Sequence, residues 1–178
     1  MQQDFPQVMN ALTVWQPWAT LLAKRLKKNE TRKQPHILQR LARSQEWFAI
    51  HAAASTPASV INEAIEREPI KTLLALHGIT ISNRVHINMP QGAIVAVARI
   101  GHCELANTCK ASQTERALGD YSAGCWVGRV VDVIELHQPI MAKGAQGLWS
   151  IPLVTQEQIQ YQLREQSAAV PEKVGILG

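Results

Sequence analysis

The chain has 178 residues, which is long enough for one domain that buries a substantial core without disulfides or metal. Hydrophobic residues make up 46% and charged residues 18%, a balance that excludes a disordered chain, and no stretch approaches the roughly twenty apolar residues that span a bilayer. We expect a globular protein of the cytoplasm, because three cysteines without paired spacing and the lack of a signal-peptide pattern favour a reducing compartment.

The net charge of +4 arises in one short window. Eight of the eighteen Lys and Arg residues lie between Lys24 and Arg43, and Glu30 is the one acid among them. The rest of the chain carries ten basic and thirteen acidic residues. Such a concentrated positive stripe predicts an anionic partner, and RNA or a nucleotide is the partner we favour. The alternative is a protein-interaction module in which the charges have no such role.

The first part of the chain predicts a strand followed by a helix. Residues 10–15 are expected to form a short strand, and Pro17 suits the first turn of a helix because its missing N–H costs nothing there. Apolar side chains recur at helical spacing from Trp18 to Leu26. This spacing leaves the solvent face, or positions beside it, to Lys24, Lys27 and Lys28.

Strands dominate the rest, with one helical insert. A buried strand over 47–51 precedes two helices between about 56 and 78, which Pro69 interrupts and Gly78 ends. Further strands are expected at 92–100, 125–136 and 146–151, and a helix at about 155–166. This order predicts the α+β class, as a small β-barrel with flanking helices. We divide the chain into a domain over 8–153 and a C-terminal helix and tail over 154–178.

Five segments follow one another in an order that resembles a known family. They are Trp15-Gln-Pro-Trp-Ala19, Lys27-x-x-Glu-Thr-Arg32, Ile50-His-Ala-Ala53, the run that begins Gly92-Ala-Ile-Val, and Lys143-Gly-Ala-Gln-Gly-Leu-Trp149. The pattern resembles the ASCH domain, a branch of the PUA-like superfamily. The resemblance implies a PUA-like β-barrel with a cleft beside the first helix and an association with RNA or modified nucleosides.

The same resemblance suggests enzyme activities as alternatives to binding. Some small bacterial members are amidohydrolases of acetylated cytidine, and ribonuclease activity has been proposed for others. Those amidohydrolases use a lysine, a threonine three residues later and a distant glutamate. Lys27 matches the lysine, whereas Glu30 stands at the threonine's position and no motif locates the distant glutamate.

Lys27 and Glu30 are therefore the candidate catalytic residues, with Glu30 as general base and Lys27 as the group that stabilises negative charge. The alternative is a surface ion pair. Candidate ligand-binding residues are Trp15, Gln16, Trp18, Arg32, His51, Lys143 and Gln146. Each also has a structural alternative: core packing for the tryptophans, local capping for Gln16, a satisfied interior position for His51 and a plain hairpin turn for the last two.

No metal or cofactor is expected. His102, Cys103 and Cys109 lack the paired spacing of a zinc site, and the chain has no glycine-rich phosphate loop and no dinucleotide fingerprint. The ligand is then either a modified nucleoside or RNA, and the shape of the site should distinguish these two. A closed pocket of nucleoside size under the 56–78 insert would favour a hydrolase of a modified nucleoside. An open groove toward Arg40 and Arg43 would favour RNA.

Overall fold

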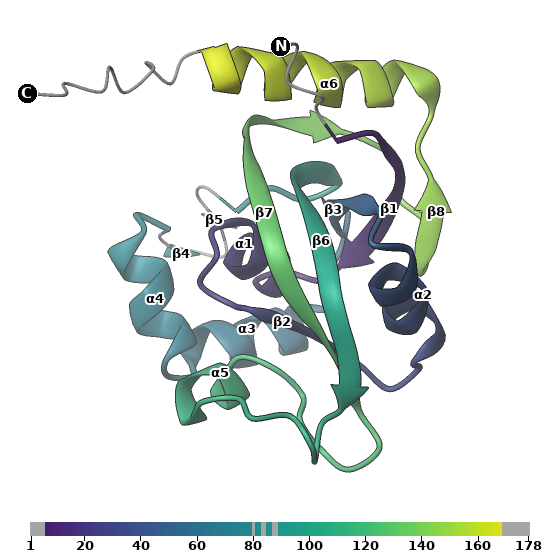
Figure 1. Ribbon diagram of the computed structural model, residues 1–178. Coiled ribbons are helices and arrows are strands. Elements are labelled where there is room, and N and C mark those ends of the chain that lie inside the picture. The colour runs from purple at the N-terminus through teal and green to yellow at the C-terminus, as the bar shows by residue number, and fades with distance from the viewer. Residues whose placement is uncertain (1–5, 80, 83–84, 87–88, 169–178) are drawn as a thin grey trace, which may run out of the picture.

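The computed structural model describes residues 6–79, 81–82, 85–86 and 89–168. The strands of the main sheet are β1 (Val8–Val14), β2 (Asn29–Arg32), β3 (Trp47–Ala52), β6 (Ala93–Leu105), β7 (Trp126–Met141) and β8 (Leu148–Ser150), while β4 (Ile81–Ser82) and β5 (Val85–His86) pair with each other. The helices are α1 (Trp18–Ala23), α2 (His36–Ser44), α3 (Ala58–Glu66), α4 (Ile70–Leu76), α5 (Gln113–Ala117) and α6 (Leu153–Ala168) (Figure 1).

The main sheet has the order β2-β7-β6-β3-β1-β8. β1 and β3 are parallel, and the other neighbouring pairs are antiparallel. A parallel pair needs a crossover connection, which α1, β2 and α2 supply here. Among the described strands, β2 and β8 end the sheet and do not pair with each other. The predicted α+β class is confirmed, whereas the closed barrel is not, because the sheet is open.

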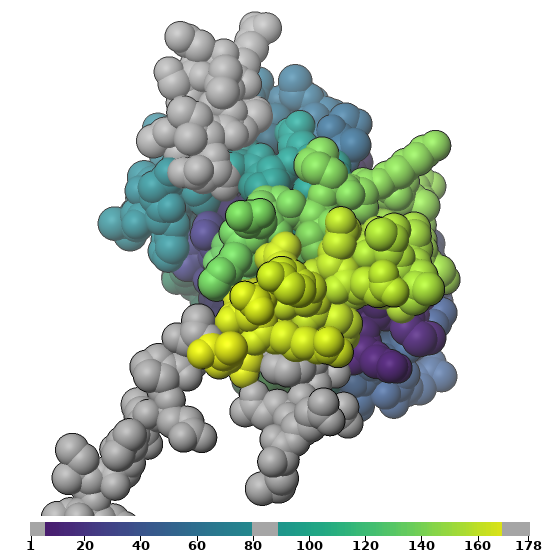
Figure 2. Space-filling view, turned by 90° about the horizontal axis from the view of Figure 1, so that it is seen from above, coloured from purple at the N-terminus to yellow at the C-terminus, as the bar shows by residue number. Residues whose placement is uncertain are grey.

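β3 lies at the centre of the core, since its side chains are buried on both faces of the sheet. Phe48 and Ile50 pack with side chains of α1 and α2 in one apolar cluster. Ala49 points the other way and packs in a second cluster with Ile159 and Leu163 of α6. This alternation follows from the period of two in a strand. Figure 2 shows α6, in yellow, lying beside β7, in green.

The first helix is shorter than the apolar spacing predicts. α1 ends at Ala23, and Arg25 has a left-handed backbone with φ of 58°. The N–H of Leu26 bonds to the carbonyl of Leu21 at 2.9 Å, and the N–H of Arg25 bonds to that of Leu22 at 3.0 Å. These two bonds form a Schellman motif, which ends the helix and reverses the chain. The predicted continuation to Leu26 is therefore wrong, and the reversal sends the following residues toward the interior.

The helical insert agrees with the sequence. α3 and α4 lie within the expected 56–78 segment, and Gly78 follows α4 with a φ of 66°. Both helices bury apolar side chains against Leu21 of α1, so the insert supports the back of the first helix. Two other helices, α2 and α5, have no counterpart in the prediction. The predicted helix at 155–166 is confirmed as α6, although it begins two residues earlier, at Leu153.

Candidate functional site

Lys27 is buried, although the helical spacing predicts it at or beside the surface. Its side chain is 2% exposed, because the reversal at Arg25 turns the chain inward. The Nζ donates a hydrogen bond to the backbone oxygen of Asn29. The ion pairs of the described residues do not include Lys27, so the surface ion pair with Glu30 is not formed. Burial lowers the pKa of Lys27 below its ordinary value, against the opposing charges of Glu30 and Glu115.

Glu30 and Arg32 come from β2, the edge strand that pairs with β7. Two residues apart on a strand, they lie on the same side. The Nε of Arg32 donates to Oε1 of Glu30 at 3.1 Å, and its Nη2 donates to the backbone oxygen of Thr13 at 2.8 Å. The Glu30 side chain is nearly buried. The guanidinium therefore fixes the carboxylate and ties β2 to the end of β1.

A cavity of ≈ 390 Å³ brings these residues together with two indoles. Five of the predicted site residues line it: Trp15, Trp18, Lys27, Glu30 and Arg32. Further lining comes from Thr13, Val14, Thr31, Lys33, Gly119 and Asp120. Trp15 lines the cavity and is 48% exposed, so its aromatic ring is accessible to a ligand. We call this cavity the Lys27 pocket.

One wall of the Lys27 pocket comes from the segment between β6 and β7, which lies outside all the predicted site residues. Gly119 and Asp120 line the pocket, and the backbone N–H of Asp120 donates to Oγ1 of Thr31 at 3.1 Å. A Cβ built on Gly119 would stand 3.2 Å from Nζ of Lys27. This glycine therefore borders the amine directly. No spacing motif marks it, so only the fold reveals its place.

Glu115 anchors this wall to β2. Its carboxylate accepts the N–H of Lys28 at 3.1 Å and the N–H of Asn29 at 2.9 Å. Ser112 caps α5 by accepting the N–H of Glu115 at 3.1 Å, as Ser does at many helix N-termini. The hydroxyl of Tyr121 accepts a hydrogen bond from Nδ2 of Asn29 at 2.9 Å. Desolvation, first among several causes, raises the pKa of Tyr121 to about 12, so this phenol stays protonated at neutral pH.

Two predicted site residues lie in the interior, outside the Lys27 pocket. Gln16 is fully buried: its Nε2 donates to the carbonyl of Pro90 at 2.6 Å, and its Oε1 accepts the N–H of Thr20 at 3.1 Å. His51 is also buried, with Nε2 3.0 Å from the carbonyl of Ala142 and Nδ1 3.2 Å from Oγ1 of Thr13. Burial lowers the pKa of His51, against the effect of its backbone hydrogen bond. Both arrangements match the structural alternatives.

The remaining predicted residues lie on the surface. Lys143 and Gln146 are exposed in the connection between β7 and β8, and neither lines the Lys27 pocket. Arg40 pairs with Glu46 at 3.5 Å, and Arg43 contacts Gln39 at 3.4 Å, both on or next to α2. The Lys27 pocket thus lies neither under the helical insert nor in a groove toward α2, because its lining residues come from neither segment.

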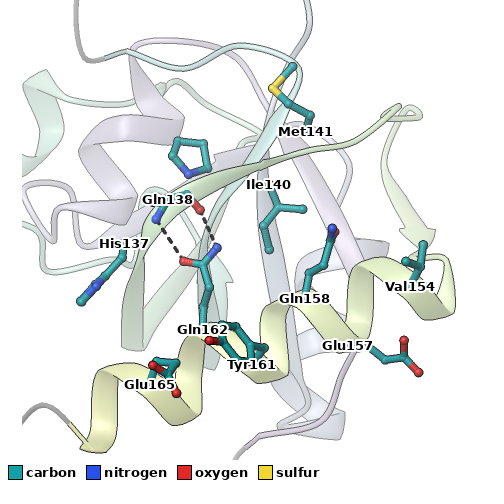
Figure 3. Close-up of a pocket in the computed structure, with 11 residues that line it drawn as sticks. His137, Gln138, Ile140, Met141, Val154, Glu157, Gln158, Tyr161, Gln162 and Glu165 are labelled. Atoms are coloured by element: carbon teal, nitrogen blue, oxygen red, sulfur yellow. Dashed lines mark hydrogen bonds between the residues drawn. The ribbon is translucent and has the colours of Figure 1, made fainter.

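A larger cavity of ≈ 750 Å³ lies between β7 and α6 (Figure 3). The side-chain amide of Gln162 pairs with the backbone of Gln138, accepting its N–H at 3.0 Å and donating to its oxygen at 2.8 Å. Glu157 and Glu165 are among the lining residues, whereas Lys and Arg are not. This lining disfavours an anionic ligand and includes none of the predicted site residues.

Comparison with known proteins returns solved structures of one family. Three crystal structures of ASCH from Zymomonas mobilis are each 12% identical in sequence. The match to the unsubstituted Zymomonas mobilis protein covers 85% of this chain and 93% of the Zymomonas chain, with a TM-score of 0.44. The match to a tyrosine-to-phenylalanine variant covers 85% of this chain and 96% of the variant, with the same TM-score. A serine-to-alanine variant covers 89% and 99% with a TM-score of 0.43.

The solved structures belong to the family that the five sequence segments resemble. A TM-score below 0.5 does not transfer a site from one protein to another, so the chemistry rests on the contacts of this chain. No family model and no curated protein matches the sequence. In the part of the chain that is described, no helix is both long and apolar enough to cross a bilayer. The same residues form no cluster of three or more His, Cys, Asp or Glu side chains suited to a metal ion.

Proposed function

We propose that the Lys27 pocket binds a nucleobase or nucleotide, either free or as part of an RNA strand. The observation that supports this proposal most is the meeting of Lys27, Glu30 and Arg32 with the indoles of Trp15 and Trp18 around one cavity of ≈ 390 Å³. Stacking of a base on an aromatic side chain contributes about 1–3 kcal/mol. The edge of a base carries both hydrogen-bond donors and acceptors, and Lys27 and Arg32 can donate to it while Glu30 can accept.

The distribution of charge favours entry with the base first. The carboxylates of Glu30 and Asp120 line the pocket and would repel a phosphate group there. Lys33 also lines the pocket but is exposed, so it is suited to a phosphate that remains in solvent. The resemblance to ASCH domains of the PUA-like superfamily supports the same ligand class, because that family is associated with RNA and modified nucleosides.

A hydrolase acting on a modified nucleoside is the second candidate. The pocket has the size of a nucleoside rather than the form of a groove along α2, and this observation favours a single bound nucleoside over a long strand. Glu115, distant in the sequence, is close enough to influence the charge of Lys27. In this mechanism Glu30 polarises a water molecule and Lys27 donates a hydrogen bond to the developing oxyanion. A ribonuclease would require the strand to continue across the pocket.

Binding and hydrolysis can be tested together. Affinities for short single-stranded RNA and for free nucleosides are measured at two salt concentrations with the wild type, Lys27→Ala and Trp15→Ala. Arg43→Ala is the matched control, because Arg43 is basic but lies outside the pocket. We expect losses of about 5-fold to 150-fold for Trp15→Ala, the equivalent of one stacking interaction.

A steep dependence on salt for RNA, with a shallow one for nucleosides, would indicate phosphate contacts outside the pocket. Hydrolysis of acylated nucleosides is screened in parallel. A hydrolytic activity that Glu30→Gln abolishes would favour the second candidate. If Lys27→Ala and Trp15→Ala bind like the wild type and nothing is hydrolysed, both proposals fail.

A further inference from the structure

The Lys27 pocket contains a buried amine, and among the described residues no carboxylate lies at ion-pair distance from it. Lys24 and Lys71 form ion pairs at 2.8 Å and 2.9 Å, whereas Lys27 has the carbonyl of Asn29 as its hydrogen-bond partner. A carbonyl acceptor engages one N–H and does not require a charged donor. Burying an ammonium group without a paired charge is costly, and a lysine in that position tends to become neutral.

The two nearby carboxylates are engaged by other donors. Glu30 accepts a hydrogen bond from Arg32 at 3.1 Å, and Glu115 accepts the backbone N–H of Lys28 and Asn29. Desolvation is the largest influence on the pKa of Lys27 and lowers it, while these two charges oppose the change. The side chain of Lys27 therefore becomes neutral at a lower pH than the side chain of an exposed lysine. A neutral amine is a nucleophile, and an ammonium group is not.

Gly119 lies directly against this amine. A Cβ at this position would stand 3.2 Å from Nζ of Lys27 and 3.1 Å from Oγ1 of Thr31. The backbone of Gly119 does not require glycine, because its φ is not among the left-handed values found in this chain. The missing side chain thus matters for space rather than for backbone conformation.

We propose that Lys27 is a nucleophilic amine that forms an imine with an aldehyde carried on a nucleobase, such as a formylated pyrimidine. The choice of a nucleobase rests on the function proposed above, whereas the nucleophile rests on the burial and contacts of Lys27. The ring stacks against Trp15 or Trp18, and the aldehyde carbon faces Nζ.

The reaction needs no oxidant or reductant. The lone pair of Nζ forms a bond to the aldehyde carbon, and the carbonyl oxygen takes a proton to give a carbinolamine. The hydroxyl group then leaves as water with the second proton of the amine, and a carbon–nitrogen double bond remains. Glu30 lines the same pocket and is suited to carry a proton from the nitrogen to the oxygen.

Reductive trapping tests the proposal on the full chain. The protein is incubated with formyluridine and cyanoborohydride, which reduces the imine to a stable secondary amine, and peptide mapping by mass spectrometry locates the adduct. We expect Lys27 to be labelled severalfold faster than Lys28 at neutral pH, since a lowered pKa leaves a larger neutral fraction of the amine. Lys28 is the matched control because it is the adjacent lysine and is exposed.

The dependence on pH and two variants sharpen the test. As the pH is raised, the rate of labelling of Lys27 should reach its plateau at a lower pH than the rate for Lys28. A lysine with only a structural role would not show this difference. Gly119→Ala should slow labelling of Lys27 by narrowing its access, and Lys28→Arg should leave it unchanged. Equal rates and equal pH profiles for Lys27 and Lys28 in the wild type would overturn the proposal, and this comparison needs no variant to fold.

A second probe separates this inference from the function proposed above. Propanal carries an aldehyde but no ring, and unmodified uridine competes for the pocket without reacting. Labelling of Lys27 by formyluridine, with protection by uridine, supports both proposals. If propanal labels Lys27 but formyluridine does not, the nucleobase is the wrong ligand class and the imine proposal fails as stated. If uridine binds but neither aldehyde labels Lys27, only the imine proposal fails.

Discussion

In the described part of the chain, two clusters of buried and half-buried polar side chains differ in how their polar atoms are paired. In the first, between β1, β3 and β8, the hydroxyl of Thr13 donates to the carbonyl of Ala145 at 2.6 Å and accepts from Nε1 of Trp149 at 3.0 Å. His51 belongs to this cluster, with Nε2 3.0 Å from the carbonyl of Ala142 and Nδ1 3.2 Å from Oγ1 of Thr13. Gln16 lies outside this cluster and is hydrogen-bonded at both ends of its side chain. In the second, around Lys27, a buried amine has no paired charge among the residues that the structure describes.

The difference separates polar groups that hold the fold from polar groups available for chemistry. A buried group whose atoms are all paired has no capacity left for a ligand, and its removal leaves its partners unpaired. A buried amine without a paired charge costs folding free energy, and proteins keep such groups mainly at functional sites. The first cluster is expected to respond to substitution in stability, and the second in ligand binding.

The largest effect is expected for Gly144→Ala. A Cβ at Gly144 would stand 2.2 Å from Cε1 of His51, whose ring lies between Oγ1 of Thr13 at 3.2 Å and the carbonyl of Ala142 at 3.0 Å. We expect a loss of about 3 kcal/mol in the free energy of unfolding, as for an overpacked core, measured by urea denaturation. Gly119→Ala is the matched control beside Lys27. It should cost less, because the atoms that its Cβ would meet, on Thr31, Lys27 and Tyr121, stand 3.1–3.2 Å away rather than 2.2 Å. Equal losses would contradict the comparison.

A smaller loss of stability is expected for Gln16→Leu. This change leaves the carbonyl of Pro90 and the N–H of Thr20 without their present partner. The expected cost is about 2 kcal/mol in the free energy of unfolding. Nucleoside affinity, measured by calorimetry at a temperature where the variant is folded, should stay within about twofold of the wild type. A large loss of affinity in a folded variant would instead support the ligand-binding role that the sequence predicts for Gln16.

A gain in stability, instead of a loss, is expected for Lys27→Met. Methionine is flexible enough to fill the space of the lysine stem, and the substitution removes the buried amine. We expect a gain of about 1 kcal/mol in the free energy of unfolding, with loss of nucleoside binding. Because burial lowers the pKa of Lys27, the folded protein loses the proton of this lysine at a lower pH than the unfolded chain does. Stability of the wild type should therefore rise relative to the variant as pH increases toward about 10. A parallel pH dependence in both proteins would refute this account.

The smallest effect concerns His51 in mild acid. Burial lowers its pKa, so the unfolded state binds more protons once the pH falls below about 6.5. Stability should then decrease as pH falls, by less than about 1 kcal/mol over the first pH unit. Thermal denaturation of the wild type and His51→Asn between neutral pH and mild acid measures the difference. If the two proteins lose stability in parallel, His51 does not cause the decrease.

Local sequence patterns located most strands and the helical insert. Alternating or continuous apolar runs mark strands wherever one or both faces of a sheet are buried, and this held for the segments that became β3 and β6. Gly78 ended α4 as predicted, because glycine tolerates a positive φ. α5 was missed because five residues are too few to show a helical period. α2 carries His36, Arg40 and Arg43 on its surface, and its helical state follows from burying Leu38 and Leu41 against the sheet.

The sequence by itself determined that an ammonium, a carboxylate and a guanidinium lie close together along the chain near aromatic side chains, since Lys27, Glu30 and Arg32 are near neighbours. Only the tertiary structure decided that the lysine is buried, because a left-handed Arg25 reverses the chain and such a conformation is unpredictable for arginine. It also brought in Glu115, which bonds to Asn29 across 86 positions. Contacts over such a separation depend on how the sheet assembles, and no local pattern encodes them.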